Sequence, residues 1–512
     1  MTFANVSTSA AHYLPTRQSL QQHPLPNWFA EAKLGILIHW GPSSVPGWAP
    51  ITQKPGAQKG DWSEWFAANP YSEWYLNSIQ IPGSPAQKHH AATYGEEFPY
   101  TNFVAQFKEA IQGWDPIGWA DLFQQVGVRY VVLSTKHHDG FLLWPSEQPN
   151  PHREEYFCPR DVVGELTAAV RERGMEMGLY YSSGLDWTFN ERIIRTVGDL
   201  RFAVPPGDNY AAYVDGHWRE LIKRYRPAVL WNDIAYPPTA DLRQLMADYY
   251  NQVPEGVVND RFQQLSSSEH LERLLEWPPT QGIASALIAR MIDWGISSPR
   301  AAATRRRRGE QFDFTTPEYR IWPSVSGLKW ECTRAIGSSF GYNRNERAET
   351  MLSVTDLVRL LVDVVSKNGN LLLGIGPTVE GRIPELQRER LVGLGRWLAV
   401  NSEAIFGTQP WTHAAGKTAE GLPVRFTLRE DNLYAILLEH PQGKHVTLDV
   451  DCPMMSAYLV GDPRLLAWEG GARGIRIALP KDLPDSPAYV IRLRLLSSHK
   501  TVSYTHLRAH ET

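Results

Sequence analysis

The chain has 512 residues, of which 43% are apolar, and 51 basic against 55 acidic side chains give it a formal net charge of -4. Such a balance gives no general attraction to nucleic acid or to an anionic membrane, so we expect neither as a partner. Single hydrophobic cores stop growing near roughly 250–300 residues, and the length therefore predicts at least two domains.

The cysteines and the N-terminal residues bear on the cellular compartment. Cys158, Cys332 and Cys452 lie far apart without metal-ligand spacing, which favours neither a disulfide framework nor a zinc site. The N-terminal residues lack the basic and apolar regions of a signal peptide, and no window reaches the roughly 18 apolar residues of a membrane span. We expect a cytoplasmic protein, although a secreted mature form without its signal would look the same.

The first half of the chain alternates between two patterns. Short apolar segments that end in polar residues recur at 34–40, 130–135, 177–182, 228–231 and 257–260. Amphipathic helical patterns lie among and after them, at 119–126, 162–173, 210–225, 357–365 and 385–400. This alternation is typical of a parallel sheet covered by helices, and polar residues at the strand ends favour a (β/α)8-like, TIM-type barrel over an open doubly wound sheet.

The pattern changes after residue 408. Alternating apolar and polar residues predict short strands at 424–427, 433–439, 446–450, 457–460 and 489–495. We therefore expect a catalytic barrel over 1–408 and a C-terminal antiparallel β-sandwich over 409–497. The tail, 498–512, continues no strand pattern and resembles translated vector sequence.

Residues 263–311 interrupt the barrel pattern. They contain four consecutive arginines at 305–308 and a weak helical run at 271–275. Loops longer than roughly 12–15 residues are usually functional or disordered. We expect a mobile surface insertion, which could act as a lid.

The segment 134–144 (STKHHDGFLLW) brings Lys136, His137, His138 and Asp139 to the end of a predicted strand. Adjacent strand residues point to opposite faces, so both histidines can reach one ligand only if the extended backbone is interrupted. The histidines could bind substrate, serve a structural role, or join Asp139 in a metal site. No His-x-His or His-x-x-x-His pair elsewhere supports the metal interpretation.

Two further segments offer carboxylates. Residues 228–236 (AVLWNDIAY) end an apolar strand in Trp231, Asn232 and Asp233, where a fixed carboxylate could attack a sugar carbon or, alternatively, cap the next helix. Glu318 follows Pro317 in 312–319 (FDFTTPEY). Cleavage of a glycosidic bond requires one carboxylate that attacks and another that protonates the leaving oxygen.

In their order over roughly residues 20–410, these segments resemble glycoside hydrolase family twenty-nine, the α-L-fucosidases. The segments are WFAEAKLGILIHWGPSSVPGW, NPYSEWY, TKHHDGFLLW, GLYYSSGLDW, LWNDI, VVNDR, FTTPEY, KWECTRAIGSSFGYNRNE and VSKNGNLLLGIGP. The resemblance implies a retaining exo-α-L-fucosidase with Asp233 as nucleophile, Glu318 as acid/base, and no metal or organic cofactor. Its partner would be a fucosylated oligosaccharide or glycoconjugate, and a homo-oligomer is possible.

The resemblance also implies a fucose pocket. Its members would be His39, Glu73, Trp74, His137, His138, Tyr180, Trp231, Arg261 and Phe340. Polar groups would bind the hydroxyls and aromatic faces the C6 methyl. The remaining alternatives are a metal-dependent hydrolase built on the His-His-Asp cluster and an inactive fucose-binding protein.

Two features depart from the family pattern. The insertion lengthens the chain between Arg261 and Glu318, so that another loop could supply the acid/base. Gly374 stands where the family usually has Asn, and we expect this change to alter a contact near the barrel floor and to leave the pocket intact.

Overall fold

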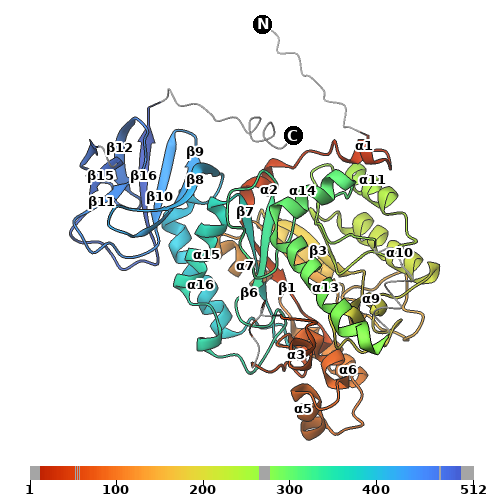
Figure 1. Ribbon diagram of the computed structural model, residues 1–512. Helices are drawn as coiled ribbons and strands as arrows, with labels where there is room; N and C mark the ends of the chain where they lie inside the picture. Colours follow the sequence, from red (N-terminus) through yellow and green to blue (C-terminus); the bar gives the residue numbers. More distant parts are fainter. Residues whose placement is uncertain are drawn as a thin grey trace.

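The computed structural model describes residues 12–51, 54, 56, 58–264, 277–471 and 474–496. A parallel β-sheet forms the centre of the larger part of the molecule (Figure 1). Its seven strands are ordered β5, β4, β3, β2, β1, β7, β6. They span Leu34–Ile38 (β1), Tyr130–Lys136 (β2), Glu176–Ser182 (β3), Val229–Asp233 (β4), Val257–Val258 (β5), Trp330–Ala335 (β6) and Gly369–Ile375 (β7).

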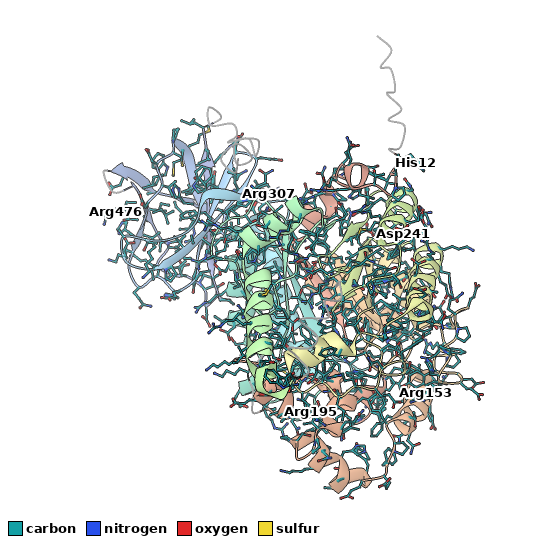
Figure 2. The ribbon with its side chains drawn as sticks, turned by 45° about the vertical axis from the view of Figure 1, so that its right-hand side comes forward. His12, Arg153, Arg195, Asp241, Arg307 and Arg476 are labelled. Carbon is teal, nitrogen blue, oxygen red and sulfur yellow. The ribbon has the colours of Figure 1, made fainter. Side chains whose placement is uncertain are left out.

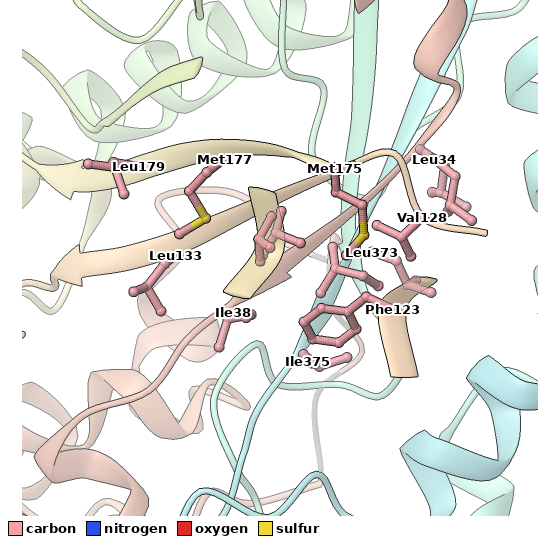
Figure 3. Packing of buried hydrophobic residues seen from close by; sticks show 14 of the residues in the cluster. Leu34, Ile38, Phe123, Val128, Leu133, Met175, Met177, Leu179, Leu373 and Ile375 are labelled. Atoms are coloured by element: carbon pink, nitrogen blue, oxygen red, sulfur yellow. The ribbon is translucent and has the colours of Figure 1, made fainter. Parts of the chain in front are cut away.

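Every residue of β1, β2 and β7 is buried, as expected for parallel strands covered on both faces. Figure 3 shows Ile38 of β1, Leu133 of β2 and Ile375 of β7 in one apolar cluster with Phe123 of the neighbouring helix. These strands form a rigid support for the residues that follow them.

Helices connect the strands and cover the sheet. They span Arg17–Leu20 (α1), Asn27–Ala32 (α2), Ser63–Ala67 (α3), Tyr75–Gln80 (α4), Pro85–Tyr94 (α5), Thr101–Ala110 (α6), Pro116–Val126 (α7), Val162–Glu172 (α8), Val197–Ala203 (α9), Asp208–Tyr225 (α10), Leu242–Gln252 (α11), Pro278–Ser297 (α13), Pro299–Arg308 (α14), Val354–Ser366 (α15) and Glu385–Asn401 (α16). The five predicted helices are confirmed as α7, α8, α10, α15 and α16. Polar side chains at the N-cap satisfy free backbone N–H groups, for example Asp115 before α7 and Ser353 before α15.

An extended segment lies between the two edge strands of the sheet. Isolated parallel bridges join Asn259 to Phe314, Thr315 to Trp330, and Glu318 to Thr333. The segment 314–318 therefore pairs with the chain after β5 on one side and with β6 on the other.

The expected surface insertion, 263–311, is helical in most of its described part. Residues 278–308 form α13 and α14, and α13 packs against α9. Ser298 accepts a hydrogen bond from Ala301 N at the start of α14, and Gly309 ends the helix with a positive φ of 102°. The arginines occupy the last turn of α14, where positively charged side chains interact favourably with the helix dipole. The predicted run at 271–275 and the tail at 498–512 lie outside the described residues.

Two antiparallel sheets follow the parallel sheet along the chain, and Figure 1 shows them in blue beside α15 and α16. One has the order β13, β12, β16, β10, β9, β8 and the other the order β11, β15, β14. Both contribute to a single hydrophobic core. Their strands are Gln409–Lys417 (β8), Pro423–Arg429 (β9), Asn432–Leu437 (β10), His445–Leu448 (β11), Met454–Leu459 (β12), Leu465–Leu466 (β13), Trp468–Gly471 (β14), Gly474–Ala478 (β15) and Tyr489–Leu495 (β16).

Membrane insertion is a separate question from the fold. Within the described ranges, none of the helices has the length and apolar character needed to cross a bilayer.

Candidate active site

The candidate site residues come from many separate segments and meet at the carboxyl ends of the parallel strands. His39 directly follows β1, His137 follows β2, and Asp233 is the last residue of β4. Arg261 lies three residues after β5, and Glu318 ends the segment that pairs with β6. The carboxyl ends of parallel strands lie at the same end of the sheet, so residues distant in sequence become neighbours.

The Asp233 carboxylate is held by three donors. Tyr180 donates its hydroxyl to Oδ2 at 2.6 Å, while Arg261 Nη1 and the Ile234 backbone N–H donate to Oδ1, both at 2.8 Å. Its side chain is 11% exposed. Asp241 occupies the N-cap of α11, so the alternative of Asp233 as the cap of the next helix is wrong.

One guanidinium links the two candidate catalytic carboxylates. Arg261 Nη2 donates to Glu318 Oε2 at 3.1 Å, while its Nη1 binds Asp233. Burial alone lowers the pKa of Arg261, but the charges of Asp233 and Glu318 raise it overall. The guanidinium also lies 4.8 Å from the centre of the Trp231 ring. The insertion between Arg261 and Glu318 therefore does not move Glu318 away from the neighbourhood of Asp233.

The adjacent histidines reach the same site. Strand β2 ends at Lys136 and a turn begins at His138, which supplies the expected break in extended geometry. The rings of His137 and His138 lie 3.9 Å apart. His138 Nε2 is 4.0 Å from Asp233 Oδ2, and the His39 ring is 5.3 Å from that of His137.

The three histidines remain neutral near pH 7. Burial lowers the pKa of His39 to about 4. Burial also lowers the pKa values of His137 and His138 well below the usual value for an imidazole, and nearby positive charge adds to this effect. Neutral imidazoles both donate and accept hydrogen bonds, as hydroxyl groups require.

Two of these imidazoles have polar atoms that the protein leaves unpaired. In the described part of the chain, His39 Nδ1 and His137 Nδ1 are buried without a hydrogen-bond partner. By contrast, His138 Nδ1 lies 2.7 Å from Ser182 Oγ. Buried polar groups are normally satisfied, so unpaired nitrogens beside a carboxylate indicate a binding site for a polar ligand.

Glu73 lies against the loop after β6. Its Oε2 accepts from Gly341 N at 2.8 Å and from Ser339 Oγ at 3.0 Å. Burial raises the pKa of Glu73 to about 7, and these hydrogen bonds oppose the rise. This carboxyl can therefore exchange a proton near neutral pH.

Aromatic rings enclose the polar groups. Tyr180 stacks on Trp231 with ring centres 5.3 Å apart, and Trp74 lies edge-on to His138 at 4.9 Å. Phe340 lies 5.3 Å from His39. Eight of the nine predicted pocket residues thus fall in one connected set of contacts, and Glu73 binds Gly341, the chain neighbour of Phe340.

The expectation that Gly374 lies near the barrel floor is wrong. Gly374 lies near the carboxyl end of β7, and a Cβ there would stand 2.6 Å from Cδ1 of Phe340. The glycine therefore makes room for a ring of the pocket.

The histidines do not share a ligand set with Asp139. Asp139 Oδ2 accepts from the Tyr100 hydroxyl at 2.8 Å and Oδ1 from Phe141 N at 3.2 Å, so both oxygens serve the turn that follows β2. Across the residues with described positions, no group of three His, Cys, Asp or Glu side chains is arranged to hold a metal ion. The metal-site alternative is not supported.

Several contributors are absent from the sequence prediction. Tyr71 donates to Glu318 Oε1 at 2.8 Å. Glu331 lies behind Trp231 and accepts from its Nε1 at 2.9 Å. Tyr71 belongs to the recognised NPYSEWY segment, which could have identified it. Glu331 belongs to the recognised KWECTRAIGSSFGYNRNE segment, which could likewise have identified it.

The chain is similar to known proteins over most of its length. A family model described as Alpha-L-fucosidase matches residues 1–281 and 289–403. The chain is 31% identical over 503 residues to tissue alpha-L-fucosidase of Mus musculus, covering 95% of this chain and 96% of the relative. It is 32% identical to the alpha-L-fucosidase of Branchiostoma floridae, covering 94% and 96%. The solved alpha-fucosidase of Thermotoga maritima in complex with a mechanism-based inhibitor is 40% identical, with a TM-score of 0.79 and coverage of 94% of this chain and 100% of that chain.

Proposed function

The chain belongs to the α-L-fucosidase family, glycoside hydrolase family twenty-nine, and we propose that it removes terminal α-L-fucosyl residues from glycans by a retaining mechanism with Asp233 as nucleophile and Glu318 as acid/base. The observation that carries these two roles is the bridge that Arg261 makes between them. Contact with one guanidinium limits the separation of the two carboxylates. This favours the short spacing of retaining enzymes, roughly 5–5.5 Å between carboxyl groups, over the wider inverting one.

In the first step, Asp233 attacks C1 of the fucosyl unit while Glu318 protonates the departing glycosidic oxygen. The product is a covalent β-fucosyl enzyme, with the leaving glycan released as an alcohol. In the second step, Glu318 takes a proton from water, the water oxygen attacks C1, and the bond to Asp233 breaks. Two inversions return the α configuration.

The surrounding groups have distinct roles in this proposal. Neutral His39, His137 and His138, together with Glu73, bind the fucose hydroxyls. Trp74, Tyr180, Trp231 and Phe340 cover the apolar face and the C6 methyl. Arg261 keeps a positive charge between the carboxylates and fixes their orientation. In this proposal the pocket holds one terminal sugar, as exo action on a fucosylated oligosaccharide requires.

Asp233→Gly tests the nucleophile directly. Turnover of an aryl α-L-fucoside should fall by several orders of magnitude because no carboxylate remains to attack C1. Added azide fits the space and should restore part of the turnover, with β-fucosyl azide as the product by NMR. The wild-type enzyme with azide is the control. Unchanged turnover in the variant would contradict the proposal.

We also propose that the parallel sheet closes as a (β/α)8-like barrel, over residues 1–408, and that 409–497 form a β-sandwich. The segment 314–318 pairs with the chain after β5 on one side and with β6 on the other, which supports its place as the eighth strand of the barrel. The core shared by the two antiparallel sheets supports the sandwich.

For the compartment, we propose a reducing one. Cys158, Cys332 and Cys452 are all free thiols in the structure, and the first two are buried. Free cysteines are typical of proteins that work where thiols stay reduced.

A further inference from the structure

Helix α14 reaches the active site through Arg305. Arg305 Nη1 donates to Asp260 Oδ2 at 2.7 Å, and its Nη2 donates to the Asp260 backbone carbonyl at 2.6 Å. Its Nε donates to Glu310 Oε2 at 2.7 Å. The side chain is 15% exposed and lies over the ring of Phe312. Figure 2 labels Arg307, two residues further along the same helix.

The other oxygen of the Asp260 carboxylate binds Thr316. Asp260 Oδ1 accepts from Thr316 N at 3.0 Å and from Thr316 Oγ1 at 2.9 Å. Arg305 therefore binds one oxygen of the carboxylate while Thr316 binds the other. A nearly buried carboxylate needs such partners, and the loss of its cation would loosen the whole set.

Thr316 in turn orients Arg261. Arg261 Nε donates to Thr316 Oγ1 at 2.9 Å, and its Nη2 lies 3.3 Å from the Thr316 carbonyl oxygen. These contacts fix the plane of the guanidinium that binds Asp233 and Glu318. A continuous series thus runs from Arg305 through Asp260, Thr316 and Arg261 to both carboxylates.

The two carboxylates depend on this series unequally. Asp233 keeps Tyr180 and the Ile234 N–H as donors if Arg261 shifts. Among the residues that the structure describes, Glu318 keeps only Tyr71 as a side-chain donor, and its side chain is 28% exposed against 11% for Asp233. A disturbance that enters through Arg305 should therefore displace the acid/base more than the nucleophile.

We propose that Arg305 is a positioning residue for acid catalysis, through which helix α14 holds Glu318 at the correct distance from the glycosidic oxygen. Arg305 lies within the insertion between Arg261 and Glu318. The insertion lengthens the chain between these two residues, and its helix α14 also stabilises their positions. The inference rests on the proposed roles of Asp233 and Glu318. It makes the segment part of the active-site support instead of a lid.

The test compares Arg305→Met with Arg308→Met, which makes the same change at an exposed position of the same helix. A small misplacement of a reacting group can cost a factor of about 100, so Arg305→Met should lower kcat/KM, which reports the first step, on a fucosylated disaccharide by about 10- to 100-fold. On a 4-nitrophenyl fucoside, whose leaving group needs no proton, kcat/KM should change by less than about threefold. Arg308→Met should match the wild type on both substrates.

A double-mutant cycle identifies the route. If Arg305 acts through Thr316, then Arg305→Met should cost much less in a Thr316→Val background than in the wild type. Arg305→Lys keeps the charge but not both contacts to Asp260, and it should recover part of the disaccharide activity. Melting temperatures of all variants separate a folding defect from a catalytic one, and Arg305→Lys serves if Arg305→Met does not fold.

Equal losses on the two substrates, or additive effects in the cycle, would overturn the positioning role. If Arg305→Met behaves like Arg308→Met while Asp233→Gly is inactive, this inference fails and the proposed function stands. If Asp233→Gly keeps full turnover, the proposed function itself fails, whatever Arg305→Met does.

Discussion

Three donors surround the Asp233 carboxylate, whereas Glu318 accepts from Tyr71 and Arg261 at the edge of the pocket. This difference in hydrogen bonding suits the two catalytic roles proposed for the carboxylates. A nucleophile must stay fixed below C1, while an acid/base must exchange protons first with a leaving group and then with water. The greater exposure of the Glu318 side chain, 28% against 11%, gives it access to that water.

Glu318→Ala should therefore show a loss that depends on the leaving group. General acid catalysis typically contributes about 10²- to 10⁴-fold, and we expect a loss in this range for a fucosylated disaccharide. A 4-nitrophenyl fucoside should lose much less in its first step, because nitrophenolate departs without a proton. The measurement is kcat/KM on both substrates with one enzyme preparation. Equal losses would mean that Glu318 has another role.

The sequence could predict the residues that lie at strand ends inside recognisable segments, such as His138 and Asp233. It could not predict partners that only tertiary packing supplies. Ser339 and Gly341 reach Glu73 from a loop more than 260 positions away. Arg305 stands in a run of four arginines that resembles a solvated surface, and its contacts with Asp260 and Glu310 become visible only in the folded structure.

At the scale of elements, the segment that carries Glu318 is anchored at its start by Asp313. This buried carboxylate accepts from Val258 N of β5 at 2.8 Å and from the Tyr250 hydroxyl of α11 at 2.9 Å. His23 Nδ1 lies 3.1 Å from its other oxygen. One side chain thus connects the segment to a strand, a helix and the N-terminal region.

Asp313→Ala should destabilise the fold by about 2–4 kcal/mol, because it leaves several buried polar groups without a partner. Denaturant unfolding provides the measurement. Asp121→Ala, which removes a carboxylate that is 61% exposed, is the control and should stay within about 0.5 kcal/mol of the wild type. A similar small effect for both variants would show that Asp313 does not anchor the segment.

Elements with a regular apolar pattern, such as β2 and α15, could be predicted, although the apolar strand β7 was missed. Elements with an interrupted pattern were not predicted. Strand β6 has Glu331 buried within it, and a charged residue breaks the apolar run by which strands are recognised. Strand β8 is largely exposed and shows no alternation, while β14 is exposed throughout. Helix α14 ends in four arginines, so its apolar content is too low to indicate a helix by periodicity.

At the scale of the molecule, the six-stranded C-terminal sheet shares the core of the parallel-sheet part. Tyr434, Ile436 and Val490 belong to the same buried cluster as the apolar face of α15. Arg425 forms an ion pair with Asp363 of α15, and Trp397 of α16 donates to the Ala488 carbonyl oxygen at 3.1 Å. The change of pattern after residue 408 was visible in the sequence, but this shared packing was not.

A chain that ends at residue 408 should consequently aggregate or lose cooperative unfolding, since it exposes an extended apolar surface on α15 and α16. Size-exclusion chromatography and thermal unfolding would measure this. A chain that ends at residue 496 is the control, and we expect it to retain activity and melting temperature. A monomeric, active 1–408 fragment would show that the two parts are independent.

Trapping of the reaction intermediate tests the central claim most directly. A 2-deoxy-2-fluoro-α-L-fucosyl fluoride has a good leaving group, and its fluorine at C2 slows both steps by destabilising the oxocarbenium-like transition state, so the covalent enzyme accumulates. After digestion, mass spectrometry should find one fluorofucosyl group, on the peptide that contains Asp233. A label on Glu318 or on any other carboxylate would contradict the assignment.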